Sequence, residues 1–304
     1  MALGKRLIDT SVAPSGQYNL DPSAYSYNSS ASDNIAHGQY GGQWALSFNN
    51  DGSKLFWAYT YYNYHLNKSY SLSTNWDVTT RTEISSVSLN PSNNYQNVID
   101  WKPDGTKFWQ TGYTNGASTG SRDIYEFTPS TPWDFSVSSF STYTRPDDLG
   151  HGRLLDFHGD GSKYNYLTGN DAGTSQRLRE VTLGSNWTLA SGQTTTYDVD
   201  VKSVFSELNT TGYSANVARW SPDGTTYYVV ISYYNGSSHQ GEVVAYNASV
   251  PYDIRTLSRR STSTDLILNQ ANSPSGLWFS DDGSKLFVSY YITNYQGRIE
   301  RYDL

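Results

Sequence analysis

Five copies of one short stretch decide the fold of this chain: SFNNDGSKLFWA (Ser47–Ala58), DWKPDGTKFWQT (Asp100–Thr111), DFHGDGSKYNYL (Asp156–Leu167), RWSPDGTTYYVV (Arg219–Val230) and WFSDDGSKLFVS (Trp278–Ser289). In each copy an aromatic-rich segment leads into an Asp-Gly pair, which permits the positive φ angles of a tight turn. An alternating strand follows, for example Lys285-Leu286-Phe287-Val288. Each copy therefore predicts a β-hairpin.

The spacing of the copies indicates how many strands each repeat holds. The turn aspartates are 53, 56, 63 and 59 residues apart, a period typical of a four-stranded propeller blade rather than of a two-helix solenoid repeat. A second turn follows four of the hairpins, 25 to 29 residues after the turn aspartate. It reads LSTNWDV around Trp76, PSTPWDF around Trp133, LGSNWTL around Trp187 and ASVPYDI around Tyr252. The repeat is therefore four strands, A to D, with Asp-Gly joining A to B and the Trp-Asp-type turn joining C to D.

The two ends of the chain complement one another. The last copy stops at Leu304, where strand C should end, whereas residues 24–30 precede the first A strand at the place of a D strand. Pairing the two closes a ring and removes the exposed sheet edges that invite aggregation. The sequence thus predicts an all-β protein: a five-bladed β-propeller of four-stranded antiparallel blades, its ring closed by an N-terminal strand. We expect residues 21–304 to form the propeller and residues 1–20 an N-terminal arm, either a docking segment or a disordered terminus.

Composition excludes several classes of function. Of 304 residues, 15% are aromatic and only 16% charged, the net charge is −7, and no run of Lys or Arg exceeds a pair. We therefore expect no nucleic-acid partner, since the basic footprint is missing. We also expect no membrane insertion and no signal peptide, because no segment approaches 18 apolar residues and no apolar stretch follows the basic start. No cysteine is present to form disulfides or thiolate metal sites, and the five histidines fall in separate repeats, so we predict no cofactor or metal.

The two motifs together resemble a known repeat. Asp104-Gly105-Thr106-Lys107 with Ser130-Thr131-Pro132-Trp133-Asp134, and Asp51-Gly52-Ser53-Lys54 with Ser73-Thr74-Asn75-Trp76-Asp77, are similar to the repeat of many predicted proteins of tailed bacteriophages, especially marine ones, and of related bacterial propellers. The resemblance spans residues 40–304, with departures at Thr188 and Tyr252. It implies a virion protein made in the host cytoplasm without signal peptide or disulfides. Other virion proteins are its expected partners, contacted through the N-terminal arm.

Strand order places the B-to-C and D-to-A loops on the face opposite the Asp-Gly turns. Tyr, Asn, Ser and Gly dominate the B-to-C loops, a vocabulary that suits recognition because Tyr offers rigid contact area and Asn or Ser adaptable hydrogen bonds. Tyrosine rings also stack on sugars, so host-surface glycans are the expected ligands. Packing of these tyrosines between blades or at strand ends is the alternative. The candidate ligand-binding residues are Tyr61, Tyr62, Tyr64, Tyr113, Asn115, Tyr233, Tyr234, Asn235, Tyr290, Tyr291 and Tyr295.

A catalytic alternative starts from the innermost strands. The residue four positions before each turn aspartate is Ser47, Asp100, Asp156, Arg219 or Trp278. Five-bladed propellers include glycoside hydrolases with carboxylates around a central funnel, so Asp100 and Asp156 can be an acid and base pair with Arg219 beside them. A plain ion pair between Asp156 and Arg219 is the competing interpretation.

The expected function is therefore non-catalytic. We expect a virion structural protein, at the surface, as a decoration or at the tail, with a face that binds a host glycan or receptor. The alternatives are a glycoside hydrolase or depolymerase of the same fold, and a capsid cement protein without a ligand. Fold alone does not choose among them, since propellers host binding modules and enzymes alike.

Overall fold

The structure is a computed structural model that describes residue 20 and residues 25–36, 43–61, 64–89, 94–114, 123–144, 152–168, 176–209, 213–234, 239–260, 265–268, 274–293 and 296–304. Short strands make up most of it. They are β1 (Ser26–Ala36), β2 (Gln43–Phe48), β3 (Lys54–Tyr61), β4 (Tyr64–Leu72), β5 (Arg81–Val87), β6 (Asn94–Trp101), β7 (Phe108–Thr114), β8 (Asp123–Pro129), β9 (Val137–Thr144), β10 (Gly152–Phe157), β11 (Lys163–Thr168), β12 (Arg177–Ser185), β13 (Thr188–Asp200), β14 (Ser214–Trp220), β15 (Thr226–Tyr234), β16 (His239–Ala248), β17 (Leu257–Arg259), β18 (Leu266–Ile267), β19 (Pro274–Phe279), β20 (Lys285–Thr293) and β21 (Gln296–Asp303). The helical elements are η1 (Val78–Thr80), α1 (Val201–Val204), η2 (Ser206–Asn209) and η3 (Ile254–Thr256).

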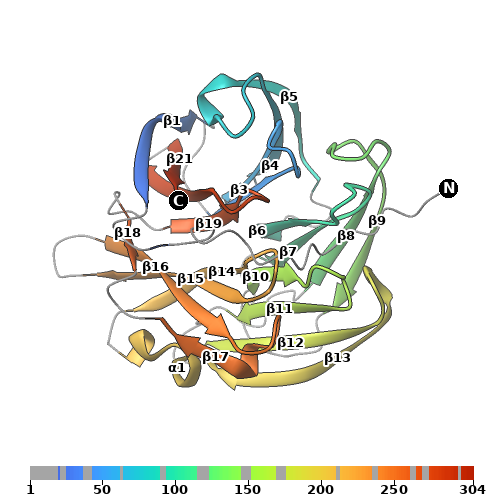
Figure 1. The fold of residues 1–304 in the computed structure, drawn as a ribbon. Helices are drawn as coiled ribbons and strands as arrows, with labels where there is room; N and C mark the ends of the chain where they lie inside the picture. The colour runs from blue at the N-terminus through green and yellow to red at the C-terminus, as the bar shows by residue number, and fades with distance from the viewer. Residues whose placement is uncertain are drawn as a thin grey trace.

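The strands form five antiparallel sheets around a common centre, and the protein is a five-bladed β-propeller (Figure 1). Blade 1 is β2-β3-β4-β5, blade 2 is β6-β7-β8-β9, blade 3 is β10-β11-β12-β13 and blade 4 is β14-β15-β16-β17, with β18 added beside β16. Blade 5 is β19-β20-β21-β1. The predicted fold class and blade count are confirmed. We call the face that carries the Asp-Gly turns the turn face, and the opposite face the loop face.

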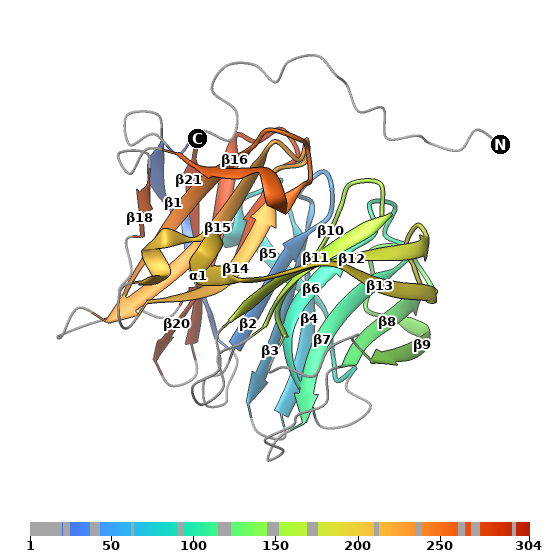
Figure 2. The ribbon, with the colours of Figure 1, turned by 90° about the horizontal axis from the view of Figure 1, so that it is seen from below.

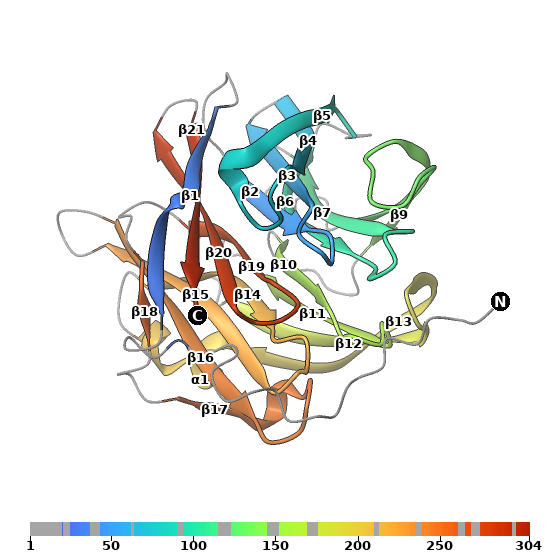
Figure 3. The same cartoon turned by 45° about the horizontal axis from the view of Figure 1, so that its top comes forward.

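Ring closure follows the prediction but with different bounds. β1, drawn in blue beside the red β21 in Figure 3, pairs with β21 from Ser26 opposite Asp303 to Ala36 opposite Gln296. The closing strand is therefore Ser26–Ala36, longer and later than the expected residues 24–30. A register shift between Asn28 and Asp33 admits extra residues on the β1 side, and such a bulge lets an outer strand bend around its blade.

The two sequence motifs of a blade interlock on the turn face. The Asp-Gly glycine has a φ near +70° in every blade, and the aromatic residue of the Trp-Asp-type turn is itself left-handed, with φ between +58° and +65°. In blade 3 the Trp187 amide donates to the Gly161 carbonyl at 2.9 Å. A Cβ at Gly161 would lie 2.1 Å from the Trp187 ring. The glycine is thus required twice, for its backbone angle and for the space its missing side chain leaves to the indole.

Neighbouring blades meet through one repeated side-chain contact. In each blade, the residue five positions after the turn aspartate lies on strand B. It packs on a strand A residue of the following blade, three positions before that blade's turn aspartate. The ring pairs are Phe56–Trp101, Trp109–Phe157, Tyr228–Phe279 and Phe287–Phe48, with centroids 4.6, 4.2, 4.5 and 4.5 Å apart. Between blades 3 and 4 the contact is polar instead, since Trp220 Nε1 donates to Asn165 Oδ1 at 2.7 Å. Offset aromatic pairs add stability beyond their buried area, so these contacts hold the ring together.

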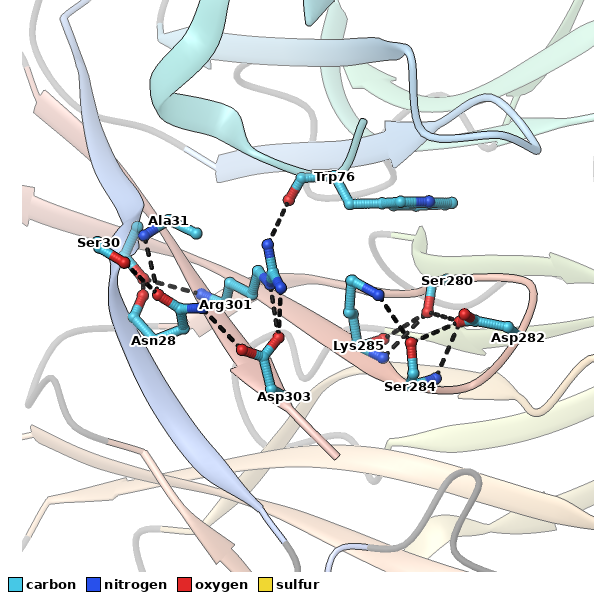
Figure 4. A network of polar contacts seen from close by, with 11 residues as sticks. Asn28, Ser30, Ala31, Trp76, Ser280, Asp282, Ser284, Lys285, Arg301 and Asp303 are labelled. Atoms are coloured by element: carbon cyan, nitrogen blue, oxygen red, sulfur yellow. Dashed lines mark hydrogen bonds and ion pairs between the residues drawn. The ribbon is translucent and has the colours of Figure 1, made fainter. Parts of the chain in front are cut away.

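Basic side chains tie three of the blades to the Trp-Asp-type turn of the next blade. Lys54 and Lys107 donate from Nζ to the carbonyls of Trp133 and Trp187 at 3.0 and 3.2 Å. At the seam between blades 5 and 1, Arg301 takes over this role: it donates to the Trp76 carbonyl at 3.2 Å and pairs with Asp303 at 2.6 Å (Figure 4).

Insertions in two D-to-A connections enlarge blade 4. α1 is drawn in yellow in Figure 2, and Phe205, which follows it, packs on Tyr246 of β16 with ring centroids 5.0 Å apart. Arg259 of β17 bonds Asp265 at 2.9 and 2.7 Å and also contacts Glu207 of η2. Among the described residues no helix is long and apolar enough to cross a membrane.

Candidate functional site

Three of the axial residues named from the sequence meet at the centre of the ring. Arg219 of β14 reaches across to Asp100 of β6, two blades away, with Nη2 2.9 Å from Oδ1. Its Nε lies 4.0 Å from Asp156 Oδ1, and its guanidinium lies 3.8 Å from the centroid of the Trp278 ring. The structure therefore brings Asp100, Asp156 and Arg219 together, and the nearer carboxylate of Arg219 is Asp100 rather than the expected Asp156.

Each aspartate also joins its blade to the following one. Asp100 Oδ2 accepts the Phe157 amide at 3.0 Å, and Asp156 Oδ2 accepts the Trp220 amide at 2.8 Å. The innermost strand of a blade is a sheet edge, so its inward amides need acceptors other than a neighbouring strand. The carboxylates supply them, which gives both aspartates a structural task that a carboxylate free for catalysis would not have.

The electrostatics of this cluster favour protonation of Asp156 near neutral pH. Burial raises the pKa of Asp156 to about 7, against the lowering effect of Arg219 and with a further increase from the Asp100 charge. Burial likewise raises the pKa of Asp100, opposed by Arg219 and by the Phe157 and Trp101 amides. One guanidinium cannot neutralise two buried carboxylates, so near neutral pH Asp156 carries a proton in part of the molecules.

A small cavity of about 90 Å³ adjoins the cluster on the turn face. Asp156, Arg219, Trp101 and Trp278 line it together with turn residues of all five blades. The Asp156 side chain is only 4% exposed there, and that of Arg219 is 18% exposed. The arrangement can hold and exchange a proton beside a small cavity, which is the geometry that the catalytic alternative would need.

A wider hollow of about 1030 Å³ surrounds the Asp160 turn, between blades 2, 3 and 4. Two aromatic residues that line it, Trp187 and Tyr252, each contact a glycine and a second ring. The Trp187 ring lies against Gly161 and stacks on Phe157 at 5.5 Å, and the Tyr252 ring lies against Gly224 and stacks on His158 at 5.1 Å. Both rings are therefore fixed in position by blade packing.

The candidate tyrosines of the loop face differ in position and burial. Tyr290 is fully buried in the core, with its hydroxyl 3.4 Å from that of Tyr302, so it is a packing residue and not part of a binding face. Tyr233 lies partly exposed at the loop-face end of β15. For five candidates only the backbone is described, at the loop-face ends of strands: Tyr61, Tyr64, Tyr113, Tyr234 and Tyr291. Tyr62, Asn115, Asn235 and Tyr295 lie outside the described residues.

Tyr233 is half of an aromatic pair that the loop sequences alone did not reveal. Tyr213, just before β14, stacks on it with ring centroids 4.4 Å apart and an interplanar angle of 6°. Ser214 opposes Ser232 in the ladder, so Tyr213 and Tyr233 are the next cross-strand pair toward the loop face. The sequence would predict this pairing if the first residue of strand A of blade 4 (β14) were known.

Among the described residues no group of three or more His, Asp or Glu side chains is placed to hold a metal ion. His158 is buried, with Nε2 3.1 Å from Asn165 Oδ1, and burial lowers its pKa. It therefore serves the interface between blades 3 and 4 in its neutral form.

Comparisons with known proteins show no activity for this chain. No family model matches the chain, and no curated protein does. Among solved structures, the chain is similar to a protein from Lactobacillus plantarum (15% identity, 81% of this chain and 63% of that one, TM-score 0.46) and to a functionally unknown protein from Desulfotomaculum acetoxidans (15%, 82% and 65%, 0.42). It is also similar to Kuenenia stuttgartiensis hydrazine synthase (11%, 84% and 75%, 0.45). The chain spans less than two thirds of the first two, and likenesses at this level carry no functional argument.

Proposed function

We propose that the chain is a non-catalytic component of a tailed-phage virion, at the surface, as a decoration or at the tail, whose loop face binds a host glycan or receptor. The support for the virion role is the repeat vocabulary of its Asp-Gly-Thr-Lys and Ser-Thr-Pro-Trp-Asp motifs. On this proposal residues 1–20 contact other virion proteins. They lie outside the described residues except for Leu20, which is fully buried in the core cluster that blades 3, 4 and 5 share.

The observation that carries the binding role is the Tyr213–Tyr233 stack. Both rings are partly exposed and lie at the loop-face end of blade 4. Exposed tyrosine rings offer contact area at a low cost in conformational entropy. The stack therefore supplies an apolar platform among the serine and asparagine side chains of the same face.

Adsorption to host cells tests this proposal. Purified protein carrying a fluorescent label is expected to bind the host cell surface and to compete with phage adsorption, and Tyr233→Ala is expected to weaken both. Immunogold labelling of virions checks the location. The proposal would be contradicted if virions show no immunogold label for the protein and the purified protein does not bind cells.

A glycan-cleaving activity is the second candidate, favoured by the near-neutral pKa of Asp156 beside the axial cavity. Its argument is weakened by the two backbone amides that the carboxylates accept. Release of reducing ends from host polysaccharide, lost in both Asp100→Asn and Asp156→Asn while the variants stay folded, would establish the enzyme instead.

A further inference from the structure

A row of side chains crosses the loop-face end of blade 4. Tyr233 lies between Tyr213 on β14's side and Gln240, its ladder partner on β16. The next row inward places Glu242 opposite Ile231. Side chains two residues apart on a strand share a face, so Glu242 is a diagonal neighbour of Tyr233, within reach of a long side chain.

Glu242 is a half-buried carboxylate with unused hydrogen-bonding capacity. Within the described part of the chain it has no hydrogen-bond or ion-pair partner, because Arg259 is engaged by Glu207 and Asp265. Burial and the Asp265 charge raise the pKa of Glu242, and Glu242 in turn contributes, after burial, to the raised pKa of Tyr233. The two groups therefore lie in one electrostatic environment.

The charge around this row is negative. Three carboxylates, Glu207, Glu242 and Asp265, face one guanidinium, Arg259. A carboxylate with free lone pairs accepts hydrogen bonds from hydroxyl groups and repels an anionic ligand at close range. The same charges oppose any approach by a polyanion.

We propose that this row is a sugar subsite on blade 4, in which the Tyr213–Tyr233 stack supports a pyranose ring and Glu242 accepts its hydroxyls, and that it selects uncharged over acidic glycans. The inference rests on the proposed function and deepens it, since it names the residues and the ligand class. Tyr213 and Glu242 are its new elements.

Binding measurements on a glycan array test the subsite. The probes are neutral hexose and N-acetylhexosamine oligosaccharides beside sialylated and uronic-acid oligosaccharides, followed by titration calorimetry with the tightest neutral binder. Wild-type protein is expected to prefer neutral glycans. Tyr233→Ala is expected to weaken binding roughly tenfold, and Tyr233→Phe, which keeps the ring, less than about threefold.

Glu242→Gln separates the role of the charge. We expect it to weaken the neutral ligand roughly tenfold or more, as for a hydrogen bond to a charged group, and to narrow the preference against acidic glycans. Glu83→Gln, an equal change of charge on β5 of blade 1, is the matched control and should bind as wild type. Circular dichroism confirms that each variant is folded.

The outcomes distinguish the two proposals. If wild-type protein binds glycans but Tyr233→Ala and Glu242→Gln bind equally well, the subsite is wrong and the glycan-binding role stands. A wild-type preference for acidic glycans would also overturn the subsite. Absence of any glycan binding together with absence of cell binding removes both.

Discussion

Replacing Gly161 by alanine tests whether the two motifs of a blade are interlocked as described. The residue has φ +71°, and a Cβ there would lie 2.1 to 2.4 Å from three atoms of the Trp187 ring. Alanine in the left-handed region costs about 1–2 kcal/mol by itself. The ring must also move, because no two heavy atoms tolerate such a separation.

The displaced ring then loses its other contacts. Trp187 stacks on Trp109 and Phe157 at 5.8 and 5.5 Å, and each aromatic pair is worth roughly 0.5–1.5 kcal/mol. Its amide hydrogen bond to the Gly161 carbonyl contributes about 1 kcal/mol more. We therefore expect Gly161→Ala to lower the free energy of unfolding by about 3–6 kcal/mol, measured by urea denaturation with circular dichroism.

Gly192→Ala is the control, because Gly192 also has a positive φ, +105°, but no heavy atom within 4 Å of the added Cβ. It should cost only the backbone strain, about 1–2 kcal/mol. In a Trp187→Ala background, Gly161→Ala should lower the free energy of unfolding only by this same backbone cost, because the clash with the ring is absent. Equal losses for Gly161→Ala and Gly192→Ala, or an undiminished loss in the Trp187→Ala background, would refute the interlock.

Two further predictions concern buried polar groups. The pKa of Asp156 rises from 3.8 to about 7 on folding, so its protonated form stabilises the fold fully below pH 4, and this contribution is lost as pH rises to about 7. Asp156→Asn removes this dependence, so between pH 5 and pH 8 its free energy of unfolding in urea should rise relative to that of wild type, by at most about 3 kcal/mol; a pH-independent difference would contradict the shift. Asn165→Leu removes the buried acceptor of Trp220 Nε1 and His158 Nε2, and should cost about 2–4 kcal/mol of unfolding free energy; unchanged thermal stability would show that both donors find other partners.

Much of the architecture could be predicted because its signals are local. Asp-Gly turns and their spacing give the hairpins and the blade count, and the missing last strand gives the closure. The interlock is less visible, since the left-handed angle of Trp76 or Trp133 arises from a contact with a glycine on another turn of the same blade. No dipeptide preference predicts that a tryptophan adopts the left-handed backbone conformation.

The candidate site could be predicted only in part. Asp100, Asp156 and Arg219 were found because the repeat register places equivalent positions around one axis. Tyr290 was misassigned because its strand is buried on both faces: Phe287 and Val288 are adjacent and both fully buried, so alternation does not reveal which tyrosine of the following pair turns inward. Tyr213 was missed because it belongs to a D-to-A connection whose length differs from blade to blade.

The closing strand also has a consequence for how the chain folds. Asn28 donates from Nδ2 to Asp303 Oδ2 at 2.7 Å across 275 positions of sequence, whereas the other blades are built from neighbouring strands. Loop-closure entropy and the folding rate both penalise such distant pairing. β1 therefore waits until β21 has been synthesised, and blade 5 is expected to complete the ring in a late, slow step of folding and to be the first blade that opens.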